Sequence, residues 1–285
     1  MLILERPWTQ QPVDTRDVEG IDAVAVWNAA AGPVDLRRRQ MGQYIDGAVT
    51  RVSQIGQVMS TTGGTNAANV PRLALPTDSS AALFRGKPTT LLMQLYPTEL
   101  GTGLGVIASM GLPSQSRCLF LIRAVSGTTA FELACNNGNW SSAIFAGAAL
   151  SNNTIYTLAL LYDGAYVALV VNGTAYAPVA LAGSAFPAAA SVDPMYVGAG
   201  NASTGSNNFW GAVAQYSLFI AARGNIGIGR AIDLTRSPAS PWQLFAPRRI
   251  PIPTPAAAAV PTLSASTYVP GSMTSTGWRP QITAS

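Results

Sequence analysis

Alternating apolar and polar positions, broken by tight turns, dominate the middle of the chain. Asp163-Gly164 and Asn172-Gly173 fall between apolar runs, and a type I′ hairpin turn needs the positive φ that such pairs accept. The pattern therefore predicts an antiparallel meander and an all-β fold class. Its three strands are expected at Tyr156–Tyr162, Ala165–Val171 and Thr174–Leu181.

Strand signals continue on both sides of this meander. The 27 Gly and 20 Pro residues suit many short strands and turns, and 48% hydrophobic content is enough for one large sandwich or two small domains. Gly101–Met110 is either a strand pair or a bulged strand, and Gly224–Leu234 is either a short helix or an irregular turn. Further strands are expected at Ala23–Ala29, Thr89–Tyr96, Cys118–Val125, Ala130–Cys135, Met195–Gly200 and Phe209–Ala221.

The ends of the chain differ in composition from its middle. Residues 1–20 are expected to form an extended arm, 21–236 the β-sandwich, 237–261 a Pro-rich docking segment and linker, and 262–285 a tail that could add a strand. Large aromatic and arginine side chains in or near these ends are candidate anchors for assembly: Trp8, Arg37, Arg38, Arg39, Trp242, Phe245, Arg248, Arg249 and Trp278.

The chain has two cysteines, which fall on neighbouring strands of a predicted hairpin. If Arg123 faces Glu132 as a cross-strand ion pair, Cys135 faces Phe120, and Cys118 lies two residues away on the diagonal. Two buried free thiols are then expected. A disulfide would need a shifted register.

Charge is scarce, at 11% of residues, and the basic residues gather towards the ends. No Lys or Arg occurs between Arg123 and Arg223, so there is no basic stripe with interleaved aromatics and no nucleic-acid partner is expected. No apolar run reaches the ~20 residues of a spanning helix, so no membrane partner is expected either. The start of the chain, Met1–Pro12, does not fit a signal peptide.

Most of the residues that catalysis needs are missing or scattered. There is no histidine, which excludes Ser-His-Asp and Cys-His pairs and histidine metal sites. Glu99, Glu132, Asp163 and Asp193 occur singly, whereas retaining glycosidases need two carboxyl groups about 5 Å apart. We therefore expect a non-enzymatic protein with no cofactor and no tightly bound metal.

The residues of the meander carry a family resemblance. The run IYTLALLYDGAYVALVVNGTAYA resembles the central hairpins of laminin-G-like, concanavalin A-like jelly-roll domains, and MYVGAG with NNFWGAVAQYSLFIAAR resembles their closing segment. The resemblance covers roughly Thr89–Arg223, and VAVWNAAAGPVDL upstream also fits. It implies a jelly-roll sandwich for residues 21–236.

The terminal segments PWTQQP, SPWQLFAPRRIPIP and TSTGWRPQIT resemble those of tailed-bacteriophage virion proteins that embed such a domain. This resemblance implies a structural component located in the virion and assembled in the host cytoplasm, most simply a capsid decoration or minor capsid protein. Its partners would be other virion proteins and further copies of itself in a homo-oligomer. The alternative is a tail-associated, lectin-like module for host carbohydrate, with candidate ligand-binding residues Asn136, Asn137, Trp140, Asn207, Asn208 and Trp210.

Overall fold

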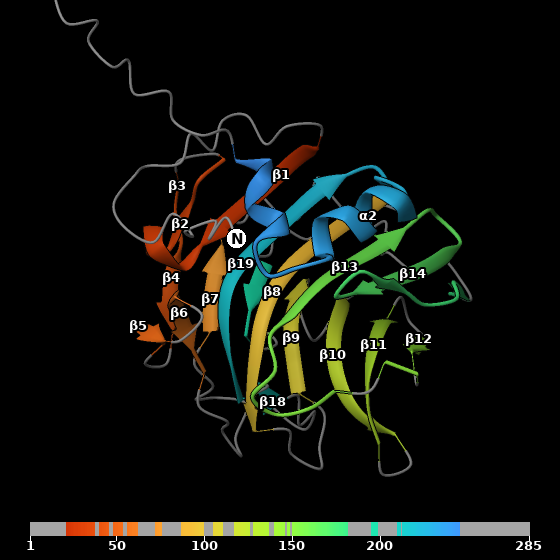
Figure 1. The fold of residues 1–285 in the computed structure, drawn as a ribbon, viewed down its shortest axis with the longest axis horizontal. Helices are drawn as coiled ribbons and strands as arrows, with labels where there is room; N and C mark the ends of the chain where they lie inside the picture. Colours follow the sequence, from red (N-terminus) through yellow and green to blue (C-terminus); the bar gives the residue numbers. More distant parts are fainter. Residues whose placement is uncertain are drawn as a thin grey trace, which may run out of the picture. The chain divides into compact units, whose positions relative to one another are not determined.

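The structure is a computed structural model in which two antiparallel β-sheets face each other (Figure 1). We call the nine-stranded sheet sheet I and the eight-stranded sheet sheet II. The structure describes residues 21–37, 40–45, 48–53, 56–61, 72–75, 87–99, 105–110, 117–125, 128–136, 140–145, 147–148, 150–181, 195–198, 210–211 and 213–245.

Sheet I contains the predicted meander and has the order β15-β14-β13-β8-β19-β6-β5, with β1 also paired to β19 and β16 to β14. Its longest strands, β8 and β19, are neighbours at its centre. The strands of sheet I are β1 (Asp22–Asn28), β5 (Val49–Ser53), β6 (Gly56–Ser60), β8 (Thr89–Glu99), β13 (Tyr156–Tyr162), β14 (Tyr166–Val171), β15 (Thr174–Ala175), β16 (Val179–Ala180) and β19 (Val213–Arg223).

Sheet II has the order β12-β11-β10-β9-β17-β7-β4, and β18 runs parallel to β9. A separate pair joins β2 (Val34–Asp35) to β3 (Gln40–Met41). The strands of sheet II are β4 (Gln43–Ile45), β7 (Arg72–Leu75), β9 (Gly105–Met110), β10 (Arg117–Val125), β11 (Thr128–Asn136), β12 (Trp140–Phe145), β17 (Met195–Val197) and β18 (Trp210–Gly211). The all-β sandwich that the sequence predicts is confirmed.

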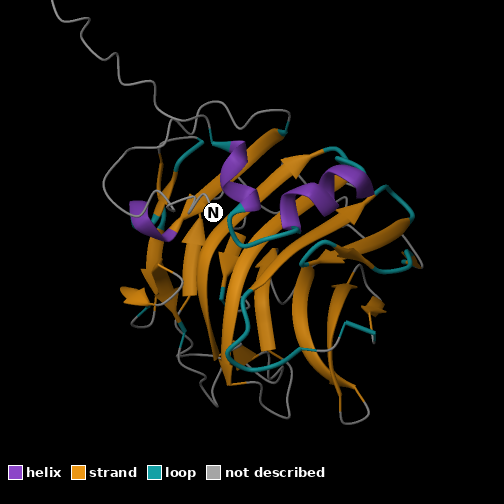
Figure 2. Cartoon of the chain, viewed as in Figure 1, coloured by secondary structure: helices purple, strands orange, loops and turns teal. Residues whose placement is uncertain are grey.

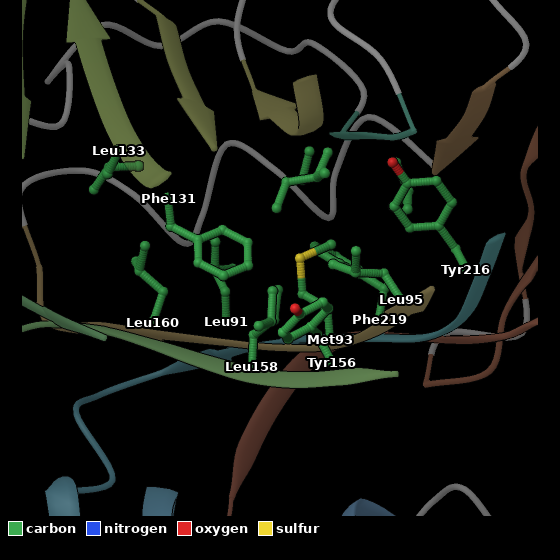
Figure 3. Packing of buried hydrophobic residues seen from close by; sticks show 14 of the residues in the cluster. Leu91, Met93, Leu95, Phe131, Leu133, Tyr156, Leu158, Leu160, Tyr216 and Phe219 are labelled. Carbon is green, nitrogen blue, oxygen red and sulfur yellow. The ribbon is translucent and has the colours of Figure 1, made fainter. Parts of the chain in front are cut away.

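The main core lies between the two sheets (Figure 3). Alternate residues of each strand point inward, so Leu91, Met93 and Leu95 of β8 face the partner sheet. Phe131 of sheet II meets Tyr156 of sheet I edge to face, with ring centroids 6.4 Å apart. Such a contact stabilises beyond the burial of its area, by about 0.5–1.5 kcal/mol.

A second core covers the outer face of sheet I. Helix α2 (Ile228–Thr235) and the 3-10 helix η3 (Ser240–Leu244) lie over β13 and β14 and the neighbouring strands (Figure 2). Ala231 and Leu234 of α2 and Leu244 of η3 are fully buried against outward side chains of the sheet. Of the two readings of Gly224–Leu234, the structure therefore selects the helix. A further 3-10 turn, η1 (Ala29–Ala31), follows β1.

A buried polar contact fixes this cover to the sheet. Gln94 of β8 is fully buried on the outer face, and its Nε2 donates to the carbonyl oxygen of Pro238 at 2.8 Å and to Thr157 Oγ1 at 3.3 Å. Ser217 Oγ donates to Gln94 Oε1 at 2.7 Å. These bonds link three strands of sheet I to the segment between α2 and η3.

The meander is confirmed, with two local differences. Asn172 and Gly173 both have positive φ, 48° and 80°, as a type I′ turn needs. At the other turn Asp163 N donates to the carbonyl oxygen of Tyr166 at 3.2 Å, so the two central residues are Gly164 and Ala165, and of these only Gly164 has a positive φ. The Asp163 carboxylate accepts the N–H groups of Ala165 and Tyr166. The third predicted strand is divided into β15 and β16, and Pro178, which has no N–H to donate, lies between them.

The prediction of one continuous strand over Phe209–Ala221 is wrong. Trp210–Gly211 forms β18 in sheet II, whereas Val213–Arg223 forms β19 in sheet I. The chain therefore changes sheets within this segment. Gly211, which weakens a strand interior, marks the position of the change.

The predicted register of the cysteine hairpin is also wrong. Val125 pairs with Thr128, which leaves a two-residue loop, the commonest hairpin connection. Arg123 therefore faces Ala130 instead of Glu132, and Cys118 faces Cys135 directly. The short loop, and not an Arg123–Glu132 ion pair, therefore sets the register of this hairpin.

No helix in the described part of the chain is long and apolar enough to cross a membrane. By its internal contacts the chain divides after Arg248, and the described residues all belong to the first unit. The predicted domain limits at residues 20, 236 and 261 stay predictions. The 3-10 helix η3 follows residue 236, where the sequence predicts the end of the sandwich, and packs on the sandwich.

Candidate functional site

The two outer faces of the sandwich differ in chemistry. Helices α2 and η3 cover an apolar outer face on sheet I. On sheet II, strand alternation places polar side chains on the outer face because their neighbours fill the core. Phe131 and Leu133 point inward, for example, and Glu132 between them does not belong to that core.

Several polar side chains on the central strands of sheet II are buried. Arg72 of β7 lies over the ring of Tyr196 of β17, with the guanidinium carbon 5.5 Å from the ring centroid. Arg72, Tyr196, Ser109 and Glu132 are all more than nine-tenths buried. This stack, which sequence reasoning missed, is therefore a packed part of the molecule. Its only sequence signal is the alternation of Arg72 with inward-facing leucines in RLAL.

The β11–β12 edge of sheet II is more exposed. Ser142 of β12 is exposed, while Ser141 and Ile144 are half-buried. At the end of this hairpin Asn136 pairs with Trp140, the last rung of a ladder of six residue pairs. The structure therefore brings these two predicted site residues together. Asn137, predicted with them, lies outside the described residues.

Trp210 occupies a different part of the same sheet. It pairs with Gly105 at the start of β9, whose neighbour across the ladder is Ile122 of β10. Asn136 instead pairs with Arg117, five residues away along β10. At about 3.4 Å per residue the two sites are about 17 Å apart along the strands. Trp140 and Trp210 therefore cannot contact the same sugar ring. Asn207 and Asn208 lie outside the described residues.

Three of the predicted assembly anchors are described, and all three contact their own chain. Arg37 Nε donates to the carbonyl oxygen of Ala23 at 3.2 Å. Trp242 packs beside Phe245, with ring centroids 5.6 Å apart, and both belong to the core under α2. Phe245 is 6% exposed, so its ring is already used within the chain. Trp8, Arg38, Arg39, Arg248, Arg249 and Trp278 lie outside the described residues.

The carboxylates of the described residues do not assemble. No group of three or more metal-binding side chains occurs among them. Asp163 is exposed, and the N–H groups of Tyr166 and Ala165 hold the pKa of its carboxyl below the usual value. Asp233 pairs with Arg236 at 2.9 Å on the surface of α2. Asp163 and Asp233 thus each have a local structural partner.

Buried tyrosines show the same structural use of polar groups. Burial raises the pKa of Tyr44, and its hydroxyl, which accepts from Thr50 Oγ1 at 3.1 Å, joins the edges of the two sheets. Burial also raises the pKa of Tyr216, which is fully enclosed in the main core.

A family model described as the concanavalin A-like lectin/glucanases superfamily matches residues 62–225. None of the curated proteins matches the sequence significantly. The structure is similar to domain 4 of a GH43 extracellular arabinanase from Geobacillus stearothermophilus, solved with arabinotriose. That match has 13% identity and a TM-score of 0.57 over 76% of this chain and 100% of the other.

Two further similar structures are parts of larger chains. The binding domain of botulinum neurotoxin DC, solved with rat synaptotagmin II, is 8% identical with a TM-score of 0.53, over 74% of this chain and 50% of the other. Trypanosoma rangeli sialidase is 12% identical with a TM-score of 0.50, over 79% of this chain and 34% of the other. At these identities the likeness concerns the fold.

Proposed function

The chain belongs to the concanavalin A-like lectin/glucanases superfamily, and from this premise we propose that it is a non-enzymatic carbohydrate-binding module. The site that we assign is the end of the β11–β12 hairpin, where Asn136 pairs with Trp140. That pairing is the observation that carries the proposal, because it sets an amide-bearing residue and an indole-bearing residue opposite each other in the ladder. An indole offers a flat apolar face, and an amide offers both a donor and an acceptor.

Three features support this location over the others. The hairpin ends at β12, the last strand in the order of sheet II, whereas β18 with Trp210 lies against β9 in the interior of the order. Ser142 is an exposed residue with a hydroxyl group, two residues from Trp140 along β12. The central polar groups of sheet II are buried, so they are not available to a soluble ligand.

The absence of catalysis is also a proposal. Hydrolysis of a glycosidic bond uses two carboxyl groups on opposite sides of the bond. In the described part of the chain, Asp163 is held by its own turn and Asp233 by Arg236. A binding module needs no such pair. The arabinanase domain was solved with arabinotriose, so this trisaccharide is the first ligand to test.

The test is calorimetric titration of the whole chain with arabinotriose and, separately, with sialic acid. We expect saturable binding that falls by about 30-fold in Trp140→Ala, the effect of losing an interface anchor worth about 2 kcal/mol. Trp210→Ala is the matched control, since it removes the same type of side chain at a position about 17 Å away along the strands and on a different strand of the sheet. Undiminished binding by a folded Trp140→Ala variant would overturn the assignment, and loss in Trp210→Ala alone would move the site to β18.

A role in a virus particle stays a prediction from the sequence. None of the similar proteins described above is a virion protein. Of its proposed anchors, Trp242 and Phe245 pack on their own domain. Recovery of the chain from purified particles is the measurement that would revive this interpretation.

A further inference from the structure

The two cysteines of the chain lie directly opposite each other in sheet II. Nine consecutive residue pairs, from Arg117–Asn136 to Val125–Thr128, join β10 and β11 without a shift in register, and Cys118–Cys135 is the second of them. Opposite residues of an antiparallel pair have Cα atoms about 4.5 or 5.5 Å apart. Both separations lie within the range of about 4.4–6.8 Å that a disulfide spans. The backbone can therefore accept the bond as it stands.

Within the chain, each of the two cysteines has only the other as a possible disulfide partner. The sequence holds two cysteines in all. The other strand neighbours in the same row are Met110, opposite Cys118 on β9, and Ser141, opposite Cys135 on β12. Pairing between Cys118 and Cys135 is thus the one intrachain disulfide available.

We propose that Cys118 and Cys135 form a cross-strand disulfide that stabilises the sandwich when the chain folds in the presence of a small-molecule disulfide such as oxidised glutathione. The two thiols lose their hydrogens and an S–S bond forms between them. The S–S bond of oxidised glutathione takes up the two electrons and two protons and yields two molecules of the reduced thiol. The exchange passes through a mixed disulfide with one glutathione.

The bond would act on the hairpin that carries the proposed site. It joins β10 to β11 at the rung next to the Arg117–Asn136 pair, and Asn136 is the residue that pairs with Trp140. A closed loop also restricts the unfolded chain, which favours the folded state. This inference stands on the register alone and does not depend on carbohydrate binding.

Trypsin digestion tests the bond directly. The full chain is incubated in a glutathione redox buffer twice, once folded and once during refolding from urea, so that burial of the thiols cannot hide the reaction. Cleavage at Arg117 and Arg123 places Cys118 in peptide 118–123, and the absence of Lys or Arg before Arg223 places Cys135 in peptide 124–223. We expect these two peptides to be linked until a reductant is added. Two free thiols, or a glutathione on each cysteine, after refolding would overturn the proposal.

Thermal melting tests the stabilising effect. We expect the oxidised chain to melt on the order of 5–10 °C above the reduced chain. The matched control is the double variant Cys118→Ser/Cys135→Ser, whose melting temperature should not respond to reductant. Equal melting temperatures of the linked and the reduced chain would refute the stabilising role. Should the double variant fail to fold, the comparison of linked and reduced wild-type chain still decides the question.

Discussion

Gln94 provides the sharpest test of how the C-terminal cover is held on the sandwich. The change is Gln94→Leu, which keeps the size of the buried side chain and removes its amide. Three hydrogen bonds are lost, to Pro238, Thr157 and Ser217. At about 1 kcal/mol each this gives about 3 kcal/mol. For a domain of this size such a loss lowers the melting temperature by about 6–12 °C.

Urea unfolding and amide hydrogen exchange provide the assay. We expect a lower midpoint together with faster exchange in α2 and η3, because Pro238 lies between those two elements. The control is Gln43→Leu, an exposed glutamine of β4 whose replacement should change stability by less than about 0.5 kcal/mol. Adding Ser217→Ala should cost less in Gln94→Leu than in wild type, since their shared bond is already lost. Unchanged stability and exchange in Gln94→Leu would show that these hydrogen bonds do not hold the cover on the sheet.

Two more predictions concern the turn regions. Gly173→Ala should destabilise the fold by about 1–2 kcal/mol or more, because φ is +80° and the new Cβ would lie 3.1 Å from Arg236 Cα. Gly229→Ala on α2 should instead stabilise it by about 0.5–1 kcal/mol. Thermal melts of the two variants compare these effects, and equal changes in melting temperature would be the contrary result. The Asp163 carboxyl has a lowered pKa in the fold, so its contribution is present above its unfolded pKa of about 3.9 and is lost as pH falls through the lowered value. Urea melts should therefore favour wild type over Asp163→Asn at pH 7 and lose that preference well below pH 4, and a constant difference would be the contrary result.

The sequence predicts the fold best where local chemistry decides the structure. Asn172 and Gly173 form the expected turn because few other residue pairs accept two positive φ values. The apolar runs at Thr89–Tyr96 and Tyr156–Tyr162 likewise form the expected strands, β8 and β13. These signals act over a few residues, so no distant contact can easily override them.

The errors arise where two local signals compete or where a distant partner decides. Arg123 and Glu132 favoured one register of the cysteine hairpin, but a two-residue loop adds further rungs to the ladder and sets another. Trp210 lies in sheet II, and not in sheet I with β19, because β18 pairs with β9. The run of apolar residues around Trp210 does not indicate this distant partner. The docking of Phe245 likewise depends on the outer face of sheet I, far away in the sequence.

The candidate site shows the same limit. Composition identified Asn136 and Trp140 as groups suited to a sugar, but their pairing across the hairpin follows from the register. The sequence also grouped them with Trp210, which the ladder of sheet II places at the other end of its strands. The Arg72–Tyr196 stack joins strands that are distant in the chain, so the alternation in RLAL alone could not predict it.

The central claim, that the β11–β12 hairpin binds carbohydrate, is tested most directly by titrating isotopically labelled chain with arabinotriose and following its amide resonances by NMR. We expect saturable shifts concentrated at Asn136, Trp140 and Ser142, with the amides of β18 and α2 unchanged. Absence of saturable shifts with arabinotriose and with sialic acid, or shifts confined to another part of the molecule, would contradict it.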